Sequence, residues 1–340
     1  LTFTEVLKRC GTQRKHLLLG NGFSIGYDPC FHYGSLFEYA KANGLSPNAQ
    51  KVFEKLGTNN FEGVMHLLED ADWVARQYGL LTSPPPSDLL TDLESVKSSL
   101  LDAIAKTHPE HTHRVPPKKK DACVSFLEPF YNIFSTNYDL LLYWVEMHGA
   151  PLHAKDGFDF DIEAPDAPYV VFSEHLGGSQ GIFFLHGALH LYTQDGEVRK
   201  HSWTRTGRML IESIKEALDK GQYPLFVAEG TANKKLSQIQ KSGYLSYCLG
   251  KLERVEKNLV VLGLSFGASD SHIANVIADN RKLSKMYVGM FDDFESPAGL
   301  ELRKNVAQIK ERRSKMVAAK RSRDELEVEF FCAKSAKVWG

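Results

Sequence analysis

Residues 17–24 read Leu17-Leu18-Leu19-Gly20-Asn21-Gly22-Phe23-Ser24, an apolar strand that stops at two glycines. A buried strand, a glycine turn and a following helix N-terminus together form a cradle for nucleotide phosphates, because glycine lets backbone N–H groups approach an anion. Three more polar motifs follow strand-like runs further along, at residues 135–139, 186–187 and 263–267. The carboxyl ends of parallel strands share one edge of a sheet, so we expect the four motifs to meet there.

Short apolar runs alternate with amphipathic segments along the whole chain. The runs lie at residues 16–20, 131–135, 181–185, 225–228, 258–263, 286–291 and 326–331. Most carry no charge, as strands buried on both faces must, and the alternation predicts an α/β protein with a Rossmann-like, doubly wound, mostly parallel sheet. The last run alternates charged and apolar residues, which predicts an edge strand.

The long separation between the first two runs predicts an insertion. More than a hundred residues lie between them, far more than one crossover helix needs. We expect a Rossmann-type domain of residues 1–44 and 122–340 and a helical insertion of residues 45–121, in which residues 61–78 and 88–106 show helical spacing of apolar side chains. We expect the irregular region at residues 151–181 to be a loop that covers the site.

Composition and charge argue against several classes of protein. The 340 residues have a formal net charge of −1, so nothing global points to nucleic acid or an anionic membrane. The five dispersed cysteines argue against a disulfide framework and a zinc ribbon. The chain shows neither a long apolar run nor a signal-peptide pattern, so we expect a cytoplasmic protein with no membrane contact. The basic segment at residues 303–323 leaves nucleic-acid contact open, although its apolar spacing favours an ordinary surface helix.

Two polar residues at strand ends are candidates for chemistry. Asn137 follows an apolar strand two residues before Asp139, which is placed to cap the next helix, and its neutral amide can orient a ribose hydroxyl or a water. His186 follows five uncharged residues and precedes Gly187. An imidazole at a strand end can act as a general base, and a buried core histidine is the competing interpretation. His190 is an alternative base that we expect in the next turn.

In this order the four motifs resemble the sirtuin-like domains that act as NAD-consuming effectors in bacterial antiphage defence. Residues 20–24 match that family's Gly-Ala-Gly-x-Ser loop with Asn21 in place of Ala, and residues 135–139 match its Thr-Gln-Asn-x-Asp segment. His186-Gly187 matches the catalytic His-Gly, and residues 263–266 match the Gly-Thr-Ser turn that contacts the adenosine half of NAD. The resemblance therefore implies an NAD-binding enzyme.

The resemblance also implies a role for each matching residue. Asn137 and His186 would perform the chemistry, and Asp139 would order the ribose side of the pocket. The pyrophosphate side of NAD would lie against Gly20, Asn21, Gly22, Phe23 and Ser24. The adenosine would face Gly263 and Ser265.

One departure from the family pattern changes the expected reaction. Sirtuin deacylases carry four cysteines, as two close pairs, on a zinc module after His-Gly. Here Cys248 is the only cysteine between His186 and Cys332, so no zinc module and no metal are expected. What remains is hydrolysis of the nicotinamide–ribose bond with NAD as the substrate. The resemblance further implies NAD depletion in abortive infection, a homo-oligomer, and a defence partner such as a hexameric ATPase.

Two alternatives remain open from the residues alone. A non-catalytic module that senses NAD or ADP-ribose needs the glycine loop but neither Asn137 nor His186. A dehydrogenase needs the spacing Gly-x-Gly-x-x-Gly, whereas the third glycine here, Gly26, comes one residue late. No second strand ends in an acidic residue at the distance that ribose recognition would require.

Overall fold

The computed structural model describes residues 1–31, 35–58, 61–81, 87–107, 112–148, 154–174, 180–207, 209–220, 222–227, 231–320 and 324–340. Its largest sheet has seven strands in the order β12-β11-β10-β1-β2-β6-β3, and all its neighbouring strands pair in parallel. The strands are β1 Lys15–Leu19, β2 Asn132–Ser135, β3 Ala154–Lys155, β6 Gln180–Phe184, β10 Lys257–Leu262, β11 Leu283–Met290 and β12 Glu327–Cys332.

The winding of the chain reverses between β1 and β10. From β1 the chain adds β2 and β6 on one side, and it later adds β10, β11 and β12 on the other. The side chains of Leu17, Leu18 and Leu19 on β1 have no exposed area, as a central strand covered on both faces requires. These features confirm the predicted doubly wound, parallel α/β fold, and β12 is the edge strand that the sequence predicts.

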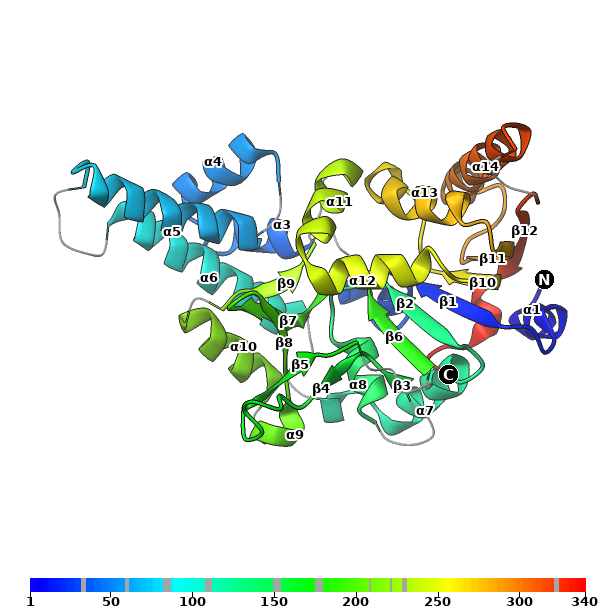
Figure 1. Ribbon diagram of the computed structural model, residues 1–340, viewed down its shortest axis with the longest axis horizontal. Helices are drawn as coiled ribbons and strands as arrows, with labels where there is room; N and C mark the ends of the chain where they lie inside the picture. Colours follow the sequence, from blue (N-terminus) through cyan, green and yellow to red (C-terminus); the bar gives the residue numbers. More distant parts are fainter. Residues whose placement is uncertain are drawn as a thin grey trace.

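Helices cover both faces of this sheet. Figure 1 shows α12, α13 and α14 on one face and α1 and α7 on the other. The helices outside the insertion are α1 Phe3–Cys10, α2 Gly22–Ile25, α7 Pro117–Leu127, α8 Leu141–Glu146, α9 Trp203–Thr206, α10 Leu210–Asp219, α11 Ala232–Lys241, α12 Gly243–Leu252, α13 Ser271–Asp279 and α14 Pro297–Ala318. Among the described residues, no helix is long and apolar enough to cross a membrane.

The long segment between β1 and β2 is helical, as predicted. It contains α3 Ser35–Ala42, α4 Pro47–Leu56, α5 Phe61–Gln77 and α6 Asp88–Thr107. These four helices project from one end of the molecule, away from β10 to β12 (Figure 1). The boundary of this insertion as a domain remains a prediction.

A second sheet, which the sequence did not predict, includes two strands from the region where a loop was expected. It is antiparallel, in the order β4-β5-β8-β7-β9, with β4 Phe158–Asp159, β5 Tyr169–Phe172, β8 Glu197–His201, β7 Gly187–Gln194 and β9 Pro224–Phe226. The expectation of an irregular loop over residues 151–181 is therefore wrong for β4 and β5. The run at 225–228 also differs from expectation, because Leu225 and Phe226 pair with β7 and not with the parallel sheet, while Ala228 lies outside the described residues.

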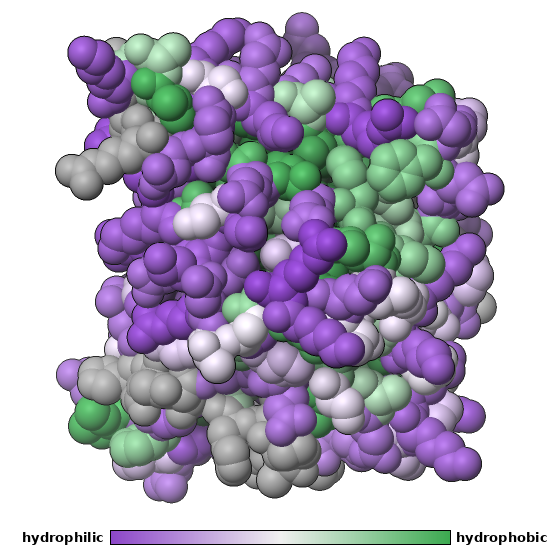
Figure 2. Space-filling view, turned by 90° about the vertical axis from the view of Figure 1, so that its right-hand side faces the viewer, coloured by the Kyte–Doolittle hydropathy of each residue, from purple (hydrophilic) through white to green (hydrophobic). Residues whose placement is uncertain are grey.

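Most of the basic segment is part of α14, and three of its basic residues have acidic partners. Arg303 pairs with Glu295, Arg312 with Asp279, and Lys315 with Glu311. Figure 2 shows the face that carries α1 and α14, where polar and charged side chains cover most of the surface. This pairing agrees with an ordinary surface helix, and residues 321–323 lie outside the described part of the chain.

Candidate active site

Two glycines meet at the point where the winding reverses. Gly20 follows β1 and Gly263 follows β10; the Gly20 N–H donates to the Leu262 carbonyl and the Gly22 N–H to the Gly263 carbonyl, each at 2.9 Å. A Cβ on Gly20 would lie 2.5 Å from the Gly263 carbonyl oxygen, and one on Gly22 would lie 2.6 Å from the Gly263 Cα. The glycines therefore allow two strand-end loops to pack backbone against backbone at the switch point, where ligands bind in open α/β sheets.

The loop at residues 20–24 directs most of its N–H groups inward. The Phe23 N–H donates to Gly20 at 2.9 Å and the Ser24 N–H to Asn21 at 3.0 Å, which starts the short helix α2. Asn21 differs: its N–H has no backbone acceptor among the described residues, and its side-chain Oδ1 is buried without a hydrogen-bond partner. Asn21 is therefore the residue of this loop with polar groups left for a ligand.

The Phe23 side chain faces the protein interior. Its ring is 1% exposed and lies 4.9 Å from the ring of Trp339, centroid to centroid. The Trp339 indole N–H also donates to the Phe23 carbonyl at 2.8 Å. These contacts make Phe23 an anchor for the loop, and its assignment to cofactor binding remains a prediction.

Asn137 is held in one orientation with one polar atom unsatisfied. Its Nδ2 donates to the Gly20 carbonyl at 3.1 Å and to the Ser24 hydroxyl at 2.9 Å, and its backbone N–H donates to the Ser135 hydroxyl at 3.0 Å. A carbonyl only accepts hydrogen bonds, so Gly20 fixes which end of the amide is Nδ2. The Asn137 Oδ1 is then buried without a donor, an arrangement that a ligand hydroxyl would satisfy.

Ser24 and Asp139 form a buried support beside Asn137. The Ser24 hydroxyl donates to the Asp139 carboxylate, which also accepts the Leu141 N–H at 2.9 Å at the start of α8. The two side chains are 0% and 1% exposed. Asp139 caps α8, and Ser24 links Asp139 to Asn137, so these contacts indicate that both residues position the Asn137 amide. Contacts of Ser24 and Asp139 with NAD remain a prediction.

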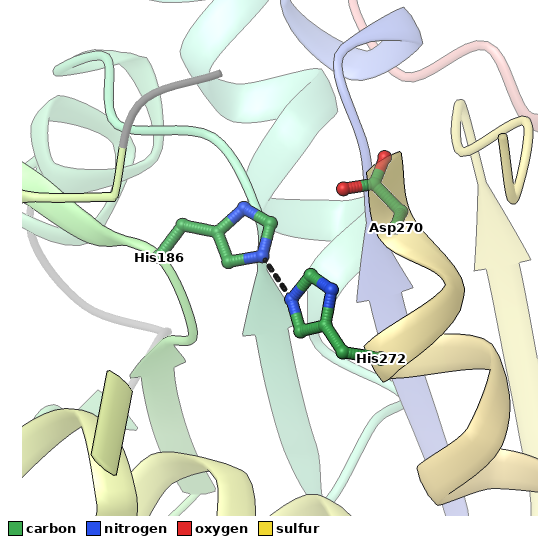
Figure 3. Close-up of side chains that lie close together, drawn as sticks. All are labelled: His186, Asp270 and His272. Atoms are coloured by element: carbon green, nitrogen blue, oxygen red, sulfur yellow. Dashed lines mark hydrogen bonds between the residues drawn. The ribbon is translucent and has the colours of Figure 1, made fainter. Parts of the chain in front are cut away.

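His186 comes directly after β6, at the same edge of the sheet as Asn137. Ser135 of β2 pairs with Phe184 of β6 in the sheet. The backbone of Thr136 forms a hydrogen bond with the His186 ring, which acts to raise the pKa of that ring. The His186 ring is 4% exposed, and its Nε2 lies 2.9 Å from the Nε2 of His272. Figure 3 shows the two rings meeting edge to edge, so one nitrogen donates a proton and the other accepts it.

The partners of His186 come from the segment that follows the glycine turn at residues 263–267. Asp270 ends a short 3₁₀ turn, Ala268–Asp270, and His272 lies in the first turn of α13. Their ligand atoms and that of His186 all lie within 4.8 Å of one another (Figure 3). Asp270 also accepts Lys235 Nζ from α11 at 2.8 Å. Sequence reasoning missed Asp270 and His272, although both follow one of the four motifs closely.

Both histidines are neutral at neutral pH. Burial lowers the pKa of His186 to about 3, and the positive charge of Lys235 acts in the same direction, whereas Asp270 opposes it. Burial likewise lowers the pKa of His272 to about 4, again against the effect of Asp270. Burial favours the neutral ring because a charged imidazolium loses hydration in the interior. Each neutral ring therefore has one nitrogen with a lone pair, and neither ring carries a positive charge.

Of the remaining sequence candidates, Gly263 belongs to this core of contacts, whereas Ser265 and His190 lie apart from it. Gly263 has φ +76°, which glycine adopts without strain, and Ser265 is exposed, with its carbonyl accepting from Asn305 Nδ2 at 3.0 Å. His190 lies in β7 and not in a turn, so that expectation is wrong. Its ring is fully buried 4.3 Å from the Tyr143 ring, and burial holds its pKa well below the usual value.

The sequence matches one family model over nearly its full length. The model is described as "Domain of unknown function (DUF4917)" and matches residues 17–339. The chain belongs to this family. None of the curated proteins is detectably similar to this DUF4917 chain in sequence.

Solved structures with a likeness to the DUF4917 chain are Sir2 proteins. "Structure of Sir2Tm bound to a propionylated peptide" has a TM-score of 0.38 at 12% identity, covering 95% of this chain and 100% of that one. "Crystal structure of a Sir2 homolog-NAD complex" has a TM-score of 0.35 at 12% identity, covering 91% and 94%. At these TM-scores the likeness decides nothing about function, which has to be argued from the residues of this chain.

Proposed function

We propose that the chain binds NAD and hydrolyses its nicotinamide–ribose bond, releasing nicotinamide and ADP-ribose. The observation that carries the proposal is the buried Asn137 Oδ1, fixed in orientation by Gly20 and left without a donor at the switch point of the sheet. An acceptor of this kind fits a ribose hydroxyl or a water. The order of the four motifs, with its resemblance to NAD-consuming effectors, supplies the identity of the ligand.

The reaction needs little more than orientation and a proton acceptor. The C1′–N bond breaks with its electron pair leaving on nicotinamide, and positive charge develops on the ribose as in other glycosidic cleavages. Water then bonds to C1′ and loses a proton. Asn137 Oδ1 would hold the ribose hydroxyl or the water, since the anchored amide is preorganised for it.

His186 would accept the proton. Its ring is neutral, as a base must be, and lies on the strand next to that of Asn137. Burial makes an imidazolium costly there, and the Asp270 carboxylate offsets that cost only in part. The proton would be shared between His186 and His272 for the duration of the step and then pass to solvent.

The other contacts of NAD are proposed from the matching residues. The pyrophosphate side would lie along Gly20 to Ser24, with Asn21 offering its backbone N–H, which has no backbone acceptor among the described residues. The buried Asn21 Oδ1 accepts hydrogen bonds only, so it would serve a ribose hydroxyl or a water and not the phosphates. The adenosine would lie toward Gly263 and Ser265. A role in antiphage defence by NAD depletion, a homo-oligomer and an ATPase partner follow from the resemblance alone and are proposed on that basis.

The test is to incubate the full chain with NAD over a range of protein concentrations and to separate the products by chromatography. We expect nicotinamide and ADP-ribose, and a loss of at least about a hundredfold in rate for Asn137→Ala and for His186→Ala. Asn43→Ala is the matched control, because Asn43 lies after α3 and donates to the Tyr39 carbonyl, away from the site. Nicotinamide release at the normal rate by either variant would show that the assignment is wrong.

A non-catalytic module that binds NAD or ADP-ribose is the second candidate. It is favoured by one observation, the engagement of His186 Nε2 by His272, which leaves the base without a free position in this conformation. Calorimetry with ADP-ribose alongside the turnover assay separates the two functions. Tight binding without products at any protein concentration would favour the module.

A further inference from the structure

His186, His272 and Asp270 come from two different parts of the sheet edge and converge on one point. His186 follows β6, whereas Asp270 and His272 follow β10, and their ligand atoms lie within 4.8 Å of one another. We propose that these three side chains form a binding site for a divalent transition-metal ion, with zinc as the ion that the donor set fits best. The sequence gives no metal-ligand spacing for this set, because 84 or more residues separate His186 from the other two.

The donor set is the first argument. Two imidazoles and one carboxylate are the protein ligands of many catalytic zinc sites, in which a fourth position stays open for water. Imidazole nitrogen suits zinc, copper, iron and nickel, whereas magnesium and calcium prefer oxygen ligands. The proposal therefore excludes magnesium as the resident ion.

The geometry of the two rings is the second argument. The two Nε2 atoms face each other at 2.9 Å, and both rings are 4% exposed. Tetrahedral zinc with bonds of about 2.0–2.1 Å holds two nitrogens somewhat further apart, at roughly 3.3 Å. The two nitrogens therefore need to separate by only a few tenths of an ångström, while each ring turns by roughly 35° so that its Nε2 points at the ion and no longer at the other ring.

The side of the His272 ring that faces away from His186 is the third argument. Its Nδ1 is buried, and the backbone of Ser269 interacts with the ring in the sense that favours a proton there. The ring can carry its proton on Nδ1 and present the Nε2 lone pair to a metal.

Lys235 competes with the ion for Asp270. Its ammonium lies 2.8 Å from the Asp270 carboxylate, and its side chain is 9% exposed. In the metal-free protein Lys235 neutralises the carboxylate, and it repels a cation brought to the same place. Removal of this charge should therefore tighten metal binding, an effect that damage to the fold cannot produce.

The experiment uses the full chain without a histidine tag, dialysed against a chelator to remove metal. Zn²⁺ affinity is measured by competition with a chromogenic chelator. Co²⁺ binding is followed by visible spectroscopy. We expect one Zn²⁺ per chain and a Co²⁺ spectrum typical of four-coordinate nitrogen and oxygen ligands. His272→Ala should weaken binding by at least about a hundredfold, and Asp270→Asn by at least about tenfold. Lys235→Gln should tighten it severalfold.

His148→Ala is the matched control, because His148 Nε2 also lies 2.9 Å from a carboxylate, that of Asp121, but at the surface. It should leave the affinity unchanged. Absence of stoichiometric Zn²⁺ binding by the wild-type chain, or undiminished binding by His272→Ala, would overturn the proposal. If His272→Ala fails to fold, the wild-type Co²⁺ spectrum and Lys235→Gln decide the question, and failure of both would overturn it.

One consequence rests on the proposed function. A zinc ion on His186 Nε2 takes the lone pair that the base needs, so Zn²⁺ should inhibit nicotinamide release with the same dependence on Lys235 as binding. Failure of the metal site and failure of the proposed function give different results in this experiment. Stoichiometric binding without inhibition leaves the metal site standing and counts against His186 as the base, whereas inhibition without stoichiometric binding counts against the metal site.

Discussion

Gly20 lies directly against Gly263, so that a Cβ on Gly20 would come within 2.5 Å of the Gly263 carbonyl oxygen and 2.6 Å of the Leu264 Cα. The contact joins the ends of β1 and β10, the two strands between which the winding reverses. The Gly20 carbonyl also accepts Nδ2 of Asn137 from the end of β2. Three strand ends are thus held together through one residue that has no side chain.

Gly20→Ala should therefore destabilise the fold as well as the site. The added methyl meets backbone atoms, which cannot rotate away as a flexible side chain can. Overpacking of this kind costs about 1–3 kcal/mol, which we expect as a fall in the free energy of unfolding in urea.

Gly250→Ala is the control for that measurement. Gly250 lies in α12, and a Cβ there would meet nothing within 4 Å. The helix should gain about 0.5–1 kcal/mol, because alanine loses less conformational entropy than glycine. A Gly20→Ala chain as stable as the wild type would contradict the packing described for the two loops.

Ser24→Ala should slow nicotinamide release without loss of substrate binding. The hydroxyl donates to Asp139 and accepts from Asn137, so its removal takes away one of the two acceptors that hold the Asn137 amide and leaves only the Gly20 carbonyl. We expect kcat to fall about tenfold or more while KM for NAD changes little, since an amide that orients the reacting group acts mainly in the transition state. A rise in KM at constant kcat would instead indicate that Ser24 contacts the substrate directly.

Arg313 should be among the most sensitive positions for stability. Its guanidinium is fully buried and donates to backbone carbonyls of Ala278, Asn280 and Leu283, among others, which joins α14 to the segment between α13 and β11. Arg313→Met leaves these acceptors without donors and should cost about 3–5 kcal/mol or prevent folding. Lysine cannot replace it, because the ammonium lacks the planar fork of donors.

Arg312→Gln serves as the neighbouring comparison. Arg312 makes two hydrogen bonds of 2.7 Å with Asp279, but both side chains are nearly half exposed. An exposed ion pair contributes less than about 1 kcal/mol. Equal losses of stability for the two variants, measured by urea unfolding, would show that burial of Arg313 is not the cause.

The parallel sheet could be predicted because most of its strands contain an uncharged apolar run, whereas the edge strand β12 alternates charged and apolar residues. The antiparallel sheet was missed, although Asp195-Gly196 joins β7 to β8 as a two-residue hairpin with φ +54° and +82°. An Asp-Gly pair between strand-like residues is a strong hairpin signal. The Asp, Pro and Gly content of residues 151–181 is typical of a loop, and for that reason β4 and β5 could not be predicted either.

From the sequence, only the placement of the candidate site residues at the ends of strands could be predicted. The sequence placed Asn137 and His186 on one edge, which the structure confirms through the register of β2 and β6. It did not predict that the N–H groups of the glycine loop would donate to the end of β10 and to the loop's own backbone, because glycine permits inward and outward directions equally. Nor did it predict His272 as the partner of His186, since that contact joins residues 86 positions apart.

His16 should make the protein less stable in weak acid. The ring lies on β1, both of its nitrogens are buried without a partner, and burial lowers its pKa to about 4 from an ordinary value of 6.5. Glu256 opposes this effect and Arg14 adds to it, while the Tyr131 ring packs edge-on at 5.9 Å.

The direction of the effect follows from proton binding by the two states. Between pH 6.5 and 4 the unfolded chain binds a proton at His16 that the folded chain excludes, so the free energy of unfolding falls as the pH falls. From pH 7 to pH 5 this single group should cost about 2 kcal/mol. Other buried histidines add to the decline, so His16→Gln, which cannot titrate, isolates the contribution: urea unfolding should show a decline smaller by that amount. Wild-type and variant curves that fall in parallel would mean that His16 is protonated in the folded protein.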